Sequence, residues 1–285
     1  MKLYKLGGVL LLSLILVGCG NSSSSSKGNN SESKTDMQNS SSKSASSSTS
    51  TQSSSSSSSQ ASTASSTIQS KTGQNPQTTN GRYDFASLTK QLAAKLPNTL
   101  LPQSTGLGQT AKAVHIRYEG NATNSTIYYS LGNKPLQLND SSLKSEQPYA
   151  TLTKKSYASS SSAQSNLDYT SAKENASLPK IDLGHSITGH TQGGAGQQYI
   201  SWNEGNWSIN VHGSKLNNTS PKQLATSMVT MFESYSLPAP KTQGSIKFSV
   251  GTGQDQTISW QDNNVIYTLK TNDHAVGIRM AASMK

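Results

Sequence analysis

The side chains of this 285-residue chain that could carry chemistry are few and widely spaced. There is one cysteine, Cys19, and the closest pair of histidines, His185 and His190, lies five residues apart. Metal-binding pairs favour spacings of three or four on a helix and two on a strand. The remaining histidines are His115, His212 and His274. Acidic residues are dispersed, so a carboxylate pair for sugar hydrolysis is not indicated. We therefore expect no metal site, no cofactor and no catalytic residue.

The serines and glycines add no catalytic motif. Ser141-Ser142-Leu143-Lys144 has the letters of a Ser-x-x-Lys motif, but neither Ser-Asp-Asn nor Lys-Thr-Gly follows it. Gly193-Gly194-Ala195-Gly196 lacks the Lys-Ser/Thr and the helix start of a phosphate-binding loop. We interpret the first match as chance in a serine-rich chain and the second as an ordinary loop.

Cys19 ends a short apolar segment at the start of the chain. Lys2 and Lys5 precede a nearly unbroken apolar run over residues 6–17, and Gly18 precedes the cysteine. These are the charged, apolar and small-residue regions of a secretion signal. The alternatives are a plain secretion signal, which would not leave a lone cysteine at the cut, and a membrane-spanning anchor, which takes roughly 20 residues.

Leu16-Val17-Gly18-Cys19 resembles a bacterial lipobox. The resemblance implies that residues 1–19 form a lipoprotein signal peptide and that Cys19 carries a diacylglyceryl group. Two acyl chains, such as palmitate, give stable membrane attachment. We therefore predict a protein anchored to the cell membrane through Cys19, on its extracellular face.

Residues 20–80 are predicted to be a disordered linker. Residues 21–80 contain 26 serines, and Met37 and Ile68 are the largest hydrophobic residues there. Such a segment cannot bury enough apolar surface to offset its chain entropy. Its root-mean-square reach would be very roughly 45 Å. The composition fits a thick-walled, Gram-positive type of cell, and it is equally compatible with glycosylation of serine and threonine.

The charge distribution of residues 81–285 argues against nucleic acid as a partner. This part of the chain has 18 Lys and Arg against 12 Asp and Glu, which gives a net charge of about +6. The charges are scattered singly, and Lys154-Lys155 is the only doublet. A nucleic-acid site would show clustered basic residues with interleaved aromatic side chains. A solvated surface with mild attraction for anionic wall polymers or lipid headgroups is the preferred interpretation.

Apolar periodicity and capping residues predict three main helices in residues 81–285. Asp84 is a candidate N-cap for a helix that Pro97 ends, and Ser220 with Pro221 begins the helix with the clearest apolar stripe. Asp273 begins a last element for which helix is favoured over strand. Residues 159–167 form a weaker helix candidate, and residues 184–198 cannot be assigned. Alternating apolar residues predict strands over residues 114–118, 126–131 and 246–250, with a further short strand within 148–157.

A repeat marks two β-hairpins. Gln198-Tyr199-Ile200-Ser201-Trp202 recurs 58 residues later as Gln256-Thr257-Ile258-Ser259-Trp260. Turn-forming residues and a second alternating run follow each copy, which predicts two hairpins with four-residue loops and identical register. That loop length pairs Trp202 with Trp207 and Ile200 with Ile209, and in the second copy Trp260 with Val265 and Ile258 with Tyr267. The two hairpins would share one sheet or belong to two copies of a small unit.

These elements predict an α+β fold for residues 81–285. An antiparallel sheet would carry helices packed on one face. The segment is long enough for one globular domain, or for two small ones near residues 81–180 and 181–285.

Six aromatic residues are candidates for contact with a ligand. Trp202, Trp207 and Trp260 could stack on sugars of the wall, but they share strand parity with Ile200, Ile209 and Ile258, which favours the core. The tyrosines, notably Tyr128, Tyr129 and Tyr149, are better candidates for an exposed contact surface.

Several motifs resemble a family of uncharacterised Gram-positive cell-surface lipoproteins. They are the segment from Tyr199 to Trp207, Leu237-Pro238-Ala239-Pro240 and the terminal Met280-Ala281-Ala282-Ser283-Met284. The likeness covers most of residues 82–285 and implies no chemistry. More distantly, the strand–turn–strand and C-terminal helix are similar to anti-sigma and lipoprotein-carrier-like domains. That similarity implies a curved half-barrel sheet whose concave side is filled by helices.

Taken together, these features predict a lipid-anchored surface protein that acts as a non-catalytic binding or structural module. Its partner would be a cell-wall polymer, a lipid or a hydrophobic peptide. The alternatives are an enzyme acting on wall polysaccharide, which needs two acids or a serine with a base in one cleft, and a transporter-associated solute-binding lipoprotein.

Overall fold

The computed structural model describes residues 81–251 and 256–285. The predicted signal peptide, Cys19 and the predicted linker lie outside the described residues. The helices and strands in chain order are α1 (Phe85–Lys95), β1 (Ala113–Gly120), β2 (Ser125–Gly132), the 3₁₀ helix η1 (Ser141–Ser145), β3 (Ala150–Ser156), α2 (Ser160–Ser165), α3 (Ala172–Asn175), β4 (Lys180–Asp182), β5 (Thr188–Gly194), β6 (Gln197–Glu204), β7 (Trp207–Ser214), α4 (Pro221–Phe232), β8 (Gly244–Ser249), β9 (Gln256–Asp262), β10 (Val265–Thr271) and α5 (His274–Ala282).

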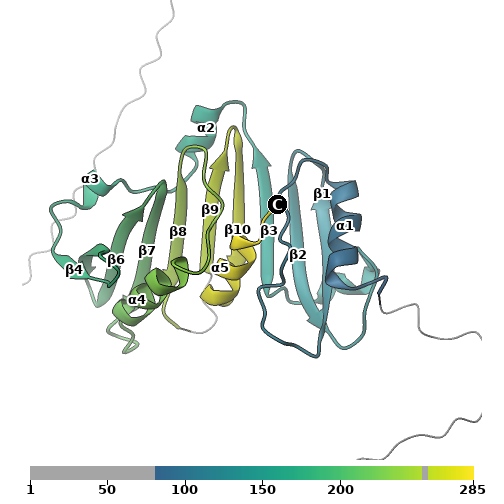
Figure 1. The fold of residues 1–285 in the computed structure, drawn as a ribbon, viewed down its shortest axis with the longest axis horizontal. Helices are drawn as coiled ribbons and strands as arrows, with labels where there is room; N and C mark the ends of the chain where they lie inside the picture. The colour runs from purple at the N-terminus through teal and green to yellow at the C-terminus, as the bar shows by residue number, and fades with distance from the viewer. Residues whose placement is uncertain (1–80, 252–255) are drawn as a thin grey trace, which may run out of the picture. The chain divides into compact units, whose positions relative to one another are not determined.

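One ten-stranded sheet organises the described residues, in the order β1-β2-β3-β10-β9-β8-β7-β6-β5-β4 (Figure 1). Neighbouring strands are antiparallel except β7 and β8, which are parallel and connected through α4. The last strand along the chain, β10, pairs with β3 from the first half of the described chain. The α+β class is therefore confirmed, and a single sheet includes strands from both halves.

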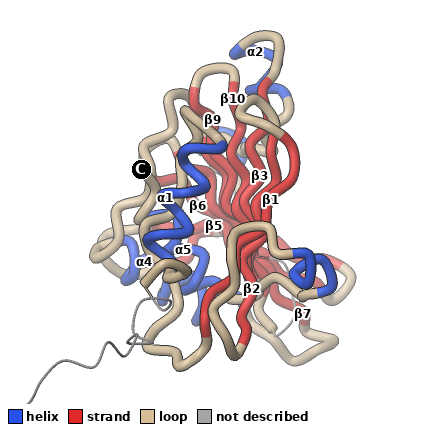
Figure 2. Tube along the Cα trace, turned by 90° about the vertical axis from the view of Figure 1, so that its right-hand side faces the viewer, coloured by secondary structure: helices blue, strands red, loops and turns tan. Residues whose placement is uncertain are grey.

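The apolar face of the sheet is covered by α1, α4 and α5, which lie on one side of it in Figure 2. Leu92, Met228 and Ile278 from these helices are fully buried together with Trp202 and Trp260 from the sheet. Burying such a side chain stabilises the fold by about 1.5–3 kcal/mol. This shared core holds the sheet and the three helices together.

The predicted N-caps are confirmed. The Asp84 carboxylate accepts a hydrogen bond from the Ser87 N–H at 2.7 Å, and Asp273 accepts one from Val276 at 2.8 Å. Ser220 caps α4. The hydrogen bonds from Ser87 also lower the pKa of Asp84. The last element is a helix, as favoured, because its capped first turn and apolar stripe fit the helical period.

The expected pairing within the two hairpins is wrong by two residues. Trp202 pairs with Ile209, and Trp260 pairs with Tyr267. Each turn contains two residues, and the first of them, Gly205 or Asn263, has a positive φ that closes the tight connection. A shift of two residues preserves side-chain parity, so the side of the sheet expected for each residue is unchanged.

The helix α2 departs from the expectation that helices lie on one face. Its residue Ala163 packs with Leu167 and Ile266 in a second apolar cluster, separate from the main core. The Gln261 side-chain amide also donates a hydrogen bond to the Ser160 carbonyl at 2.8 Å. Because Ile266 and Gln261 point away from the main core, α2 lies against the opposite face of the sheet.

The segment that could not be assigned from sequence contains all of β5 and the start of β6. Its glycine, threonine and glutamine residues show no apolar alternation. Pairing with β6, rather than apolar burial, defines β5 as a strand.

Candidate functional site

The sheet face opposite α1, α4 and α5 is polar, and we call it the outer face. A line of hydroxyl side chains crosses six neighbouring strands on this face because each member is paired directly with the next. This hydroxyl row consists of Thr126, Thr153, Thr268, Ser259, Ser245 and Ser208. Neighbouring strands lie about 4.8 Å apart, so the row presents hydroxyl groups at a regular spacing.

A parallel line of side chains carries positive charge. Pairing across the sheet aligns Arg117 with Tyr128 on β1 and β2, and it aligns Lys270, Thr257 and Lys247 on β10, β9 and β8. The two lysines are exposed. The outer face therefore combines a hydroxyl row with lysines that lie two residues away along the same strands.

The chain after β3 crosses the outer face and forms one wall of a groove. Asp168 forms an ion pair with Lys247 on β8. The Thr170 N–H donates to the Ser208 hydroxyl on β7 at 3.1 Å, and the Asn203 amide on β6 donates to the Thr170 carbonyl at 3.0 Å. These contacts fix the crossing segment over three successive strands.

The space bounded by this segment and the outer face is a groove of about 360 Å³. Its lining includes members of the hydroxyl row and three exposed lysines. The hydroxyls are Thr153, Ser245, Ser259 and Thr268, and the lysines are Lys155, Lys247 and Lys270. We call this space the sheet-face groove. With three lysines and the single carboxylate of Asp168 in its lining, it is net positive.

Lys154, beside Lys155 in the sequence, points to the opposite face. It is 6 % exposed, and its ammonium group donates a hydrogen bond to the Asn98 carbonyl at 2.6 Å. Burial lowers the pKa of Lys154, and the nearby Asp262 carboxylate partly opposes that shift. The only lysine doublet of the domain is thus divided between the two faces of the sheet.

The tryptophans lie on the core side of the sheet. Trp202 and Trp260 are each 1 % exposed, and Trp207 is 8 % exposed. None of the three can form a flat aromatic strip for stacking on sugars. Trp207 lines a pocket.

The three tyrosines that were candidates for an exposed surface have different environments. Tyr149 is half-buried, and its hydroxyl donates a hydrogen bond to the Thr105 carbonyl at 3.1 Å. The choice of Tyr129 is wrong, because strand parity places it beside the core residue Ile127 at 1 % exposure. Its burial also raises the pKa of its hydroxyl. Tyr128 is half-buried on the outer face, with the Arg117 guanidinium 3.6 Å from its ring centre.

A second pocket, of about 340 Å³, lies where the β6–β7 turn meets the connection after α4. Trp207, Phe232, Tyr235 and Leu237 contribute apolar side chains to it, and Glu204 is the one ionisable acid or base in its lining apart from the tyrosine. We call it the hairpin pocket. The sequence offered the Leu237–Pro240 motif as a mark of family resemblance, but nothing in it indicated that this segment would face Trp207.

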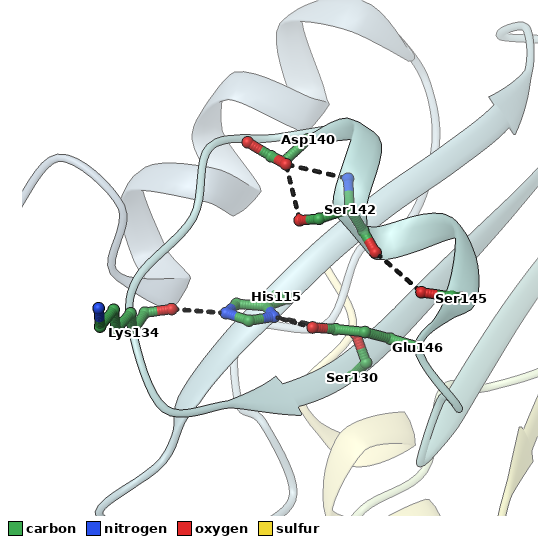
Figure 3. Close-up of polar contacts among 7 residues, drawn as sticks. All are labelled: His115, Ser130, Lys134, Asp140, Ser142, Ser145 and Glu146. Carbon is green, nitrogen blue, oxygen red and sulfur yellow. Dashed lines mark hydrogen bonds and ion pairs between the residues drawn. The ribbon is translucent and has the colours of Figure 1, made fainter.

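His115 of β1, a buried histidine, and Ser130 of β2 both contact the Glu146 carboxylate (Figure 3). His115 is 2 % exposed, and its Nδ1 lies 2.9 and 3.0 Å from the two Glu146 carboxylate oxygens. Its Nε2 lies 2.7 Å from the Lys134 carbonyl oxygen. Acceptor oxygens thus hold the ring from both of its nitrogens.

This cluster lacks the geometry of an activated nucleophile. The Ser130 hydroxyl donates to Glu146 at 2.5 Å, and no lone pair of His115 is directed at it. Partial burial opposes ionisation of Glu146, but hydrogen bonds from Ser130 and His115 outweigh it and lower the pKa of Glu146. The arrangement ties the connection between β2 and β3 to the sheet. Gly132 leaves room for it, because a Cβ atom there would lie 2.1 Å from the His115 ring.

The other histidines form no metal site in the described part of the chain, where no three His, Cys, Asp or Glu side chains gather. His190 contacts the Leu178 carbonyl at 3.3 Å, while His185 lies 3.8 Å from Glu233. Among the helices of residues 81–251 and 256–285, none has the length and apolar character needed to cross a bilayer.

Comparison with known proteins found no matching family model, curated protein or solved structure. The resemblance to Gram-positive surface lipoproteins therefore stays a prediction.

Proposed function

We propose that this protein is a lipid-anchored extracytoplasmic binding module without catalytic activity, whose sheet-face groove holds an anionic, hydroxyl-rich polymer of the cell wall. The observation that carries the proposal is the groove itself, in which hydroxyl groups from neighbouring strands lie beside three lysines. Hydroxyl groups can exchange hydrogen bonds with polyol or sugar units, and lysines attract phosphate or carboxylate groups.

The spacing of the groups favours a polymer over a single small molecule. The hydroxyl row continues beyond the groove to the half-buried Thr126 on β2. A ligand with repeating units could use successive strands as equivalent positions. An enzyme would need a converging acid–base pair, and Asp168, the carboxylate in the groove lining, is already paired with Lys247.

The start of the chain supports the proposed location. The lipobox-like residues ending at Cys19 would attach the protein to the outer leaflet, and residues 20–80 would let the domain reach into the wall. The anchor and the groove thus serve one role, which is to hold wall polymer near the membrane.

Binding to the wall tests the groove. Full-length protein in detergent would be sedimented with purified cell walls, and compared with a variant in which Lys155, Lys247 and Lys270 are all changed to Ala. We expect at least a tenfold weaker association and a shallower salt dependence, since three charges that face the polymer are removed.

A charge-matched control makes the test specific. Changing Lys90, Lys95 and Lys222 to Ala removes the same number of charges from exposed positions on α1 and α4. This control variant should bind walls like the unmodified protein. Equal losses in the two variants would mean that net charge alone, and not the groove, causes association.

The anchor is tested separately by labelling cells with radioactive palmitate. The unmodified protein should be labelled and should remain with the membrane. A Cys19→Ser variant should lose the label and be released into the medium. Label that persists in this variant would overturn the proposed anchor.

A further inference from the structure

The two hairpins of the repeat place a carboxylate at the same position, on the core side just before the turn. These residues are Glu204 in β6 and Asp262 in β9, which are 58 positions apart. Only Glu204 lines the hairpin pocket. The difference identifies Glu204 as the residue whose charge is available to a ligand.

The hairpin pocket has aromatic walls because the β6–β7 hairpin, α4 and the connection after α4 all contribute to its lining. Trp207 begins β7, and Phe232 ends α4. Tyr235 lies in the connection to β8 and is half-buried, as is Phe232. The Trp207 ring packs over Gly244, where a Cβ atom would lie 2.3 Å from the ring. The aromatic wall is thus held in place by close packing.

Glu204 has a hydrogen-bond donor but no ion-pair partner among the described residues. Its carboxylate accepts a hydrogen bond from the Trp202 indole at 3.1 Å, which fixes its position. Within residues 81–251 and 256–285 it forms no ion pair. Asp262 also forms no ion pair among these residues, but its carboxylate favours the charged form of the buried Lys154.

We propose that the hairpin pocket binds a small organic cation, an alkylated ammonium that carries an apolar body. Aromatic faces attract a cation that has lost its water, and they do so most strongly when it is alkylated and weakly hydrated. The fixed carboxylate of Glu204 supplies the opposite charge. A pocket of about 340 Å³ with mostly apolar walls and a few polar groups has the size of a small-molecule site.

This inference is independent of the wall-binding role. The sheet-face groove is net positive and lies on the outer face, whereas the hairpin pocket carries a carboxylate and lies on the core side. The two sites would bind ligands of opposite charge.

The test compares cations with a neutral molecule of the same shape. Full-length protein in detergent would be titrated with choline, with benzyltrimethylammonium and with dimethylbutanol, the choline analogue in which carbon replaces nitrogen. Tryptophan fluorescence and calorimetry would measure binding. We expect benzyltrimethylammonium to bind more tightly than choline, because it adds an apolar body, and the neutral analogue to bind at least tenfold more weakly than choline.

Two matched variants locate the charge. Glu204→Gln keeps an acceptor for the Trp202 indole while removing the negative charge, and it should weaken choline binding about tenfold or more. Asp262→Asn removes the equivalent carboxylate of the other hairpin and should leave choline binding unchanged. Tyr235→Ala should weaken binding through loss of an aromatic wall, with the unfolding temperature measured as a check on folding.

Several results would overturn the proposal. One is equal affinity for choline and its neutral analogue, and another is equal losses in Glu204→Gln and Asp262→Asn. Binding of the ammonium group only when it is displayed on phosphatidylcholine vesicles would also exclude a small-molecule site. Because Glu204→Gln leaves the groove lysines intact, wall association in this variant distinguishes failure of this inference from failure of the proposed function.

Discussion

The hairpins β6–β7 and β9–β10 share a sequence pattern, a two-residue turn and a register, yet their tryptophans have different environments. The Trp202 indole donates to Glu204 at 3.1 Å. The Trp260 indole has no hydrogen-bond partner among the described residues, and its ring stacks on Tyr267 with centroids 5.3 Å apart. The repeated local sequence therefore fixes the pairing within each hairpin but not the chemistry around it.

Neighbouring strands account for the difference. β7 lies beside β8, where Ile246 is the partner of Ile209. β10 lies beside β3, where the buried Lys154 is the partner of Tyr267. On the core side, one hairpin thus pairs with an apolar side chain and the other with a buried lysine whose charged form Asp262 favours.

The largest expected effect should be common to both hairpins. Trp202→Ala and Trp260→Ala each remove a fully buried side chain, and each should lower the free energy of unfolding by about 3–5 kcal/mol. Urea denaturation measures both values. A change close to zero in the free energy of unfolding of either variant would show that the two hairpins do not contribute equally to the core.

The second-largest expected effect is a difference between the two hairpins in the pH dependence of stability at alkaline pH. Burial raises the pKa values of Tyr129, Tyr149 and Tyr267, so the folded protein keeps protons that the unfolded chain loses. Stability from these groups is complete below about pH 10, the unfolded pKa, and is lost as pH rises further. Ile209 occupies the position equivalent to Tyr267 and cannot titrate.

Above pH 10, the free energy of unfolding of a Tyr267→Phe variant should therefore fall less steeply than that of the unmodified protein. The difference in slope should be as much as about 1.4 kcal/mol per pH unit. Denaturation curves across this range, each referred to the same variant at neutral pH, give the slope. An unchanged slope would mean that Tyr267 ionises equally in the folded and unfolded states.

Replacing each tryptophan by phenylalanine isolates the indole hydrogen bond. Trp202→Phe leaves Glu204 without its donor, whereas Trp260→Phe removes an N–H group that is buried without a partner. We expect Trp202→Phe to be more destabilising by about 1 kcal/mol. The reverse order in urea denaturation would contradict the distinction between the two indoles.

The smallest expected effect comes from a substitution that makes the β9–β10 hairpin resemble the β6–β7 hairpin. Asp262→Glu lengthens the side chain by one methylene and brings an acceptor within reach of the Trp260 indole, as Glu204 does for Trp202. We expect a gain of about 0.5–1 kcal/mol in the free energy of unfolding. Glu204→Asp is the matched control and should be destabilising by a similar amount.

Local sequence predicted much of the fold. Asp84, Ser220 and Asp273 were predictable as N-caps because a cap depends on the next few backbone N–H groups. The tryptophans were predictable as core residues because strand parity needs only alternation. The four-residue loops were wrong because the turn residues Gly205 and Asn263 allow a tighter connection that composition alone does not distinguish.

The candidate site was harder to predict. Tyr129 was assigned to the surface although its strand parity with Ile127 indicates the core. The groove lysines at positions 155, 247 and 270 are scattered in the sequence, and only strand pairing brings them together. Nor could the sequence indicate that the connection after α4 would face Trp207 and form a pocket.

The sequence by itself determined helix starts, strand faces and the two hairpins, because these depend on contacts between residues close together in the chain. Only the tertiary structure decided that β10 lies between β3 and β9, and hence which side chains line the groove. The reason is that strand order and cavities arise from contacts between distant segments, which neither periodicity nor capping records.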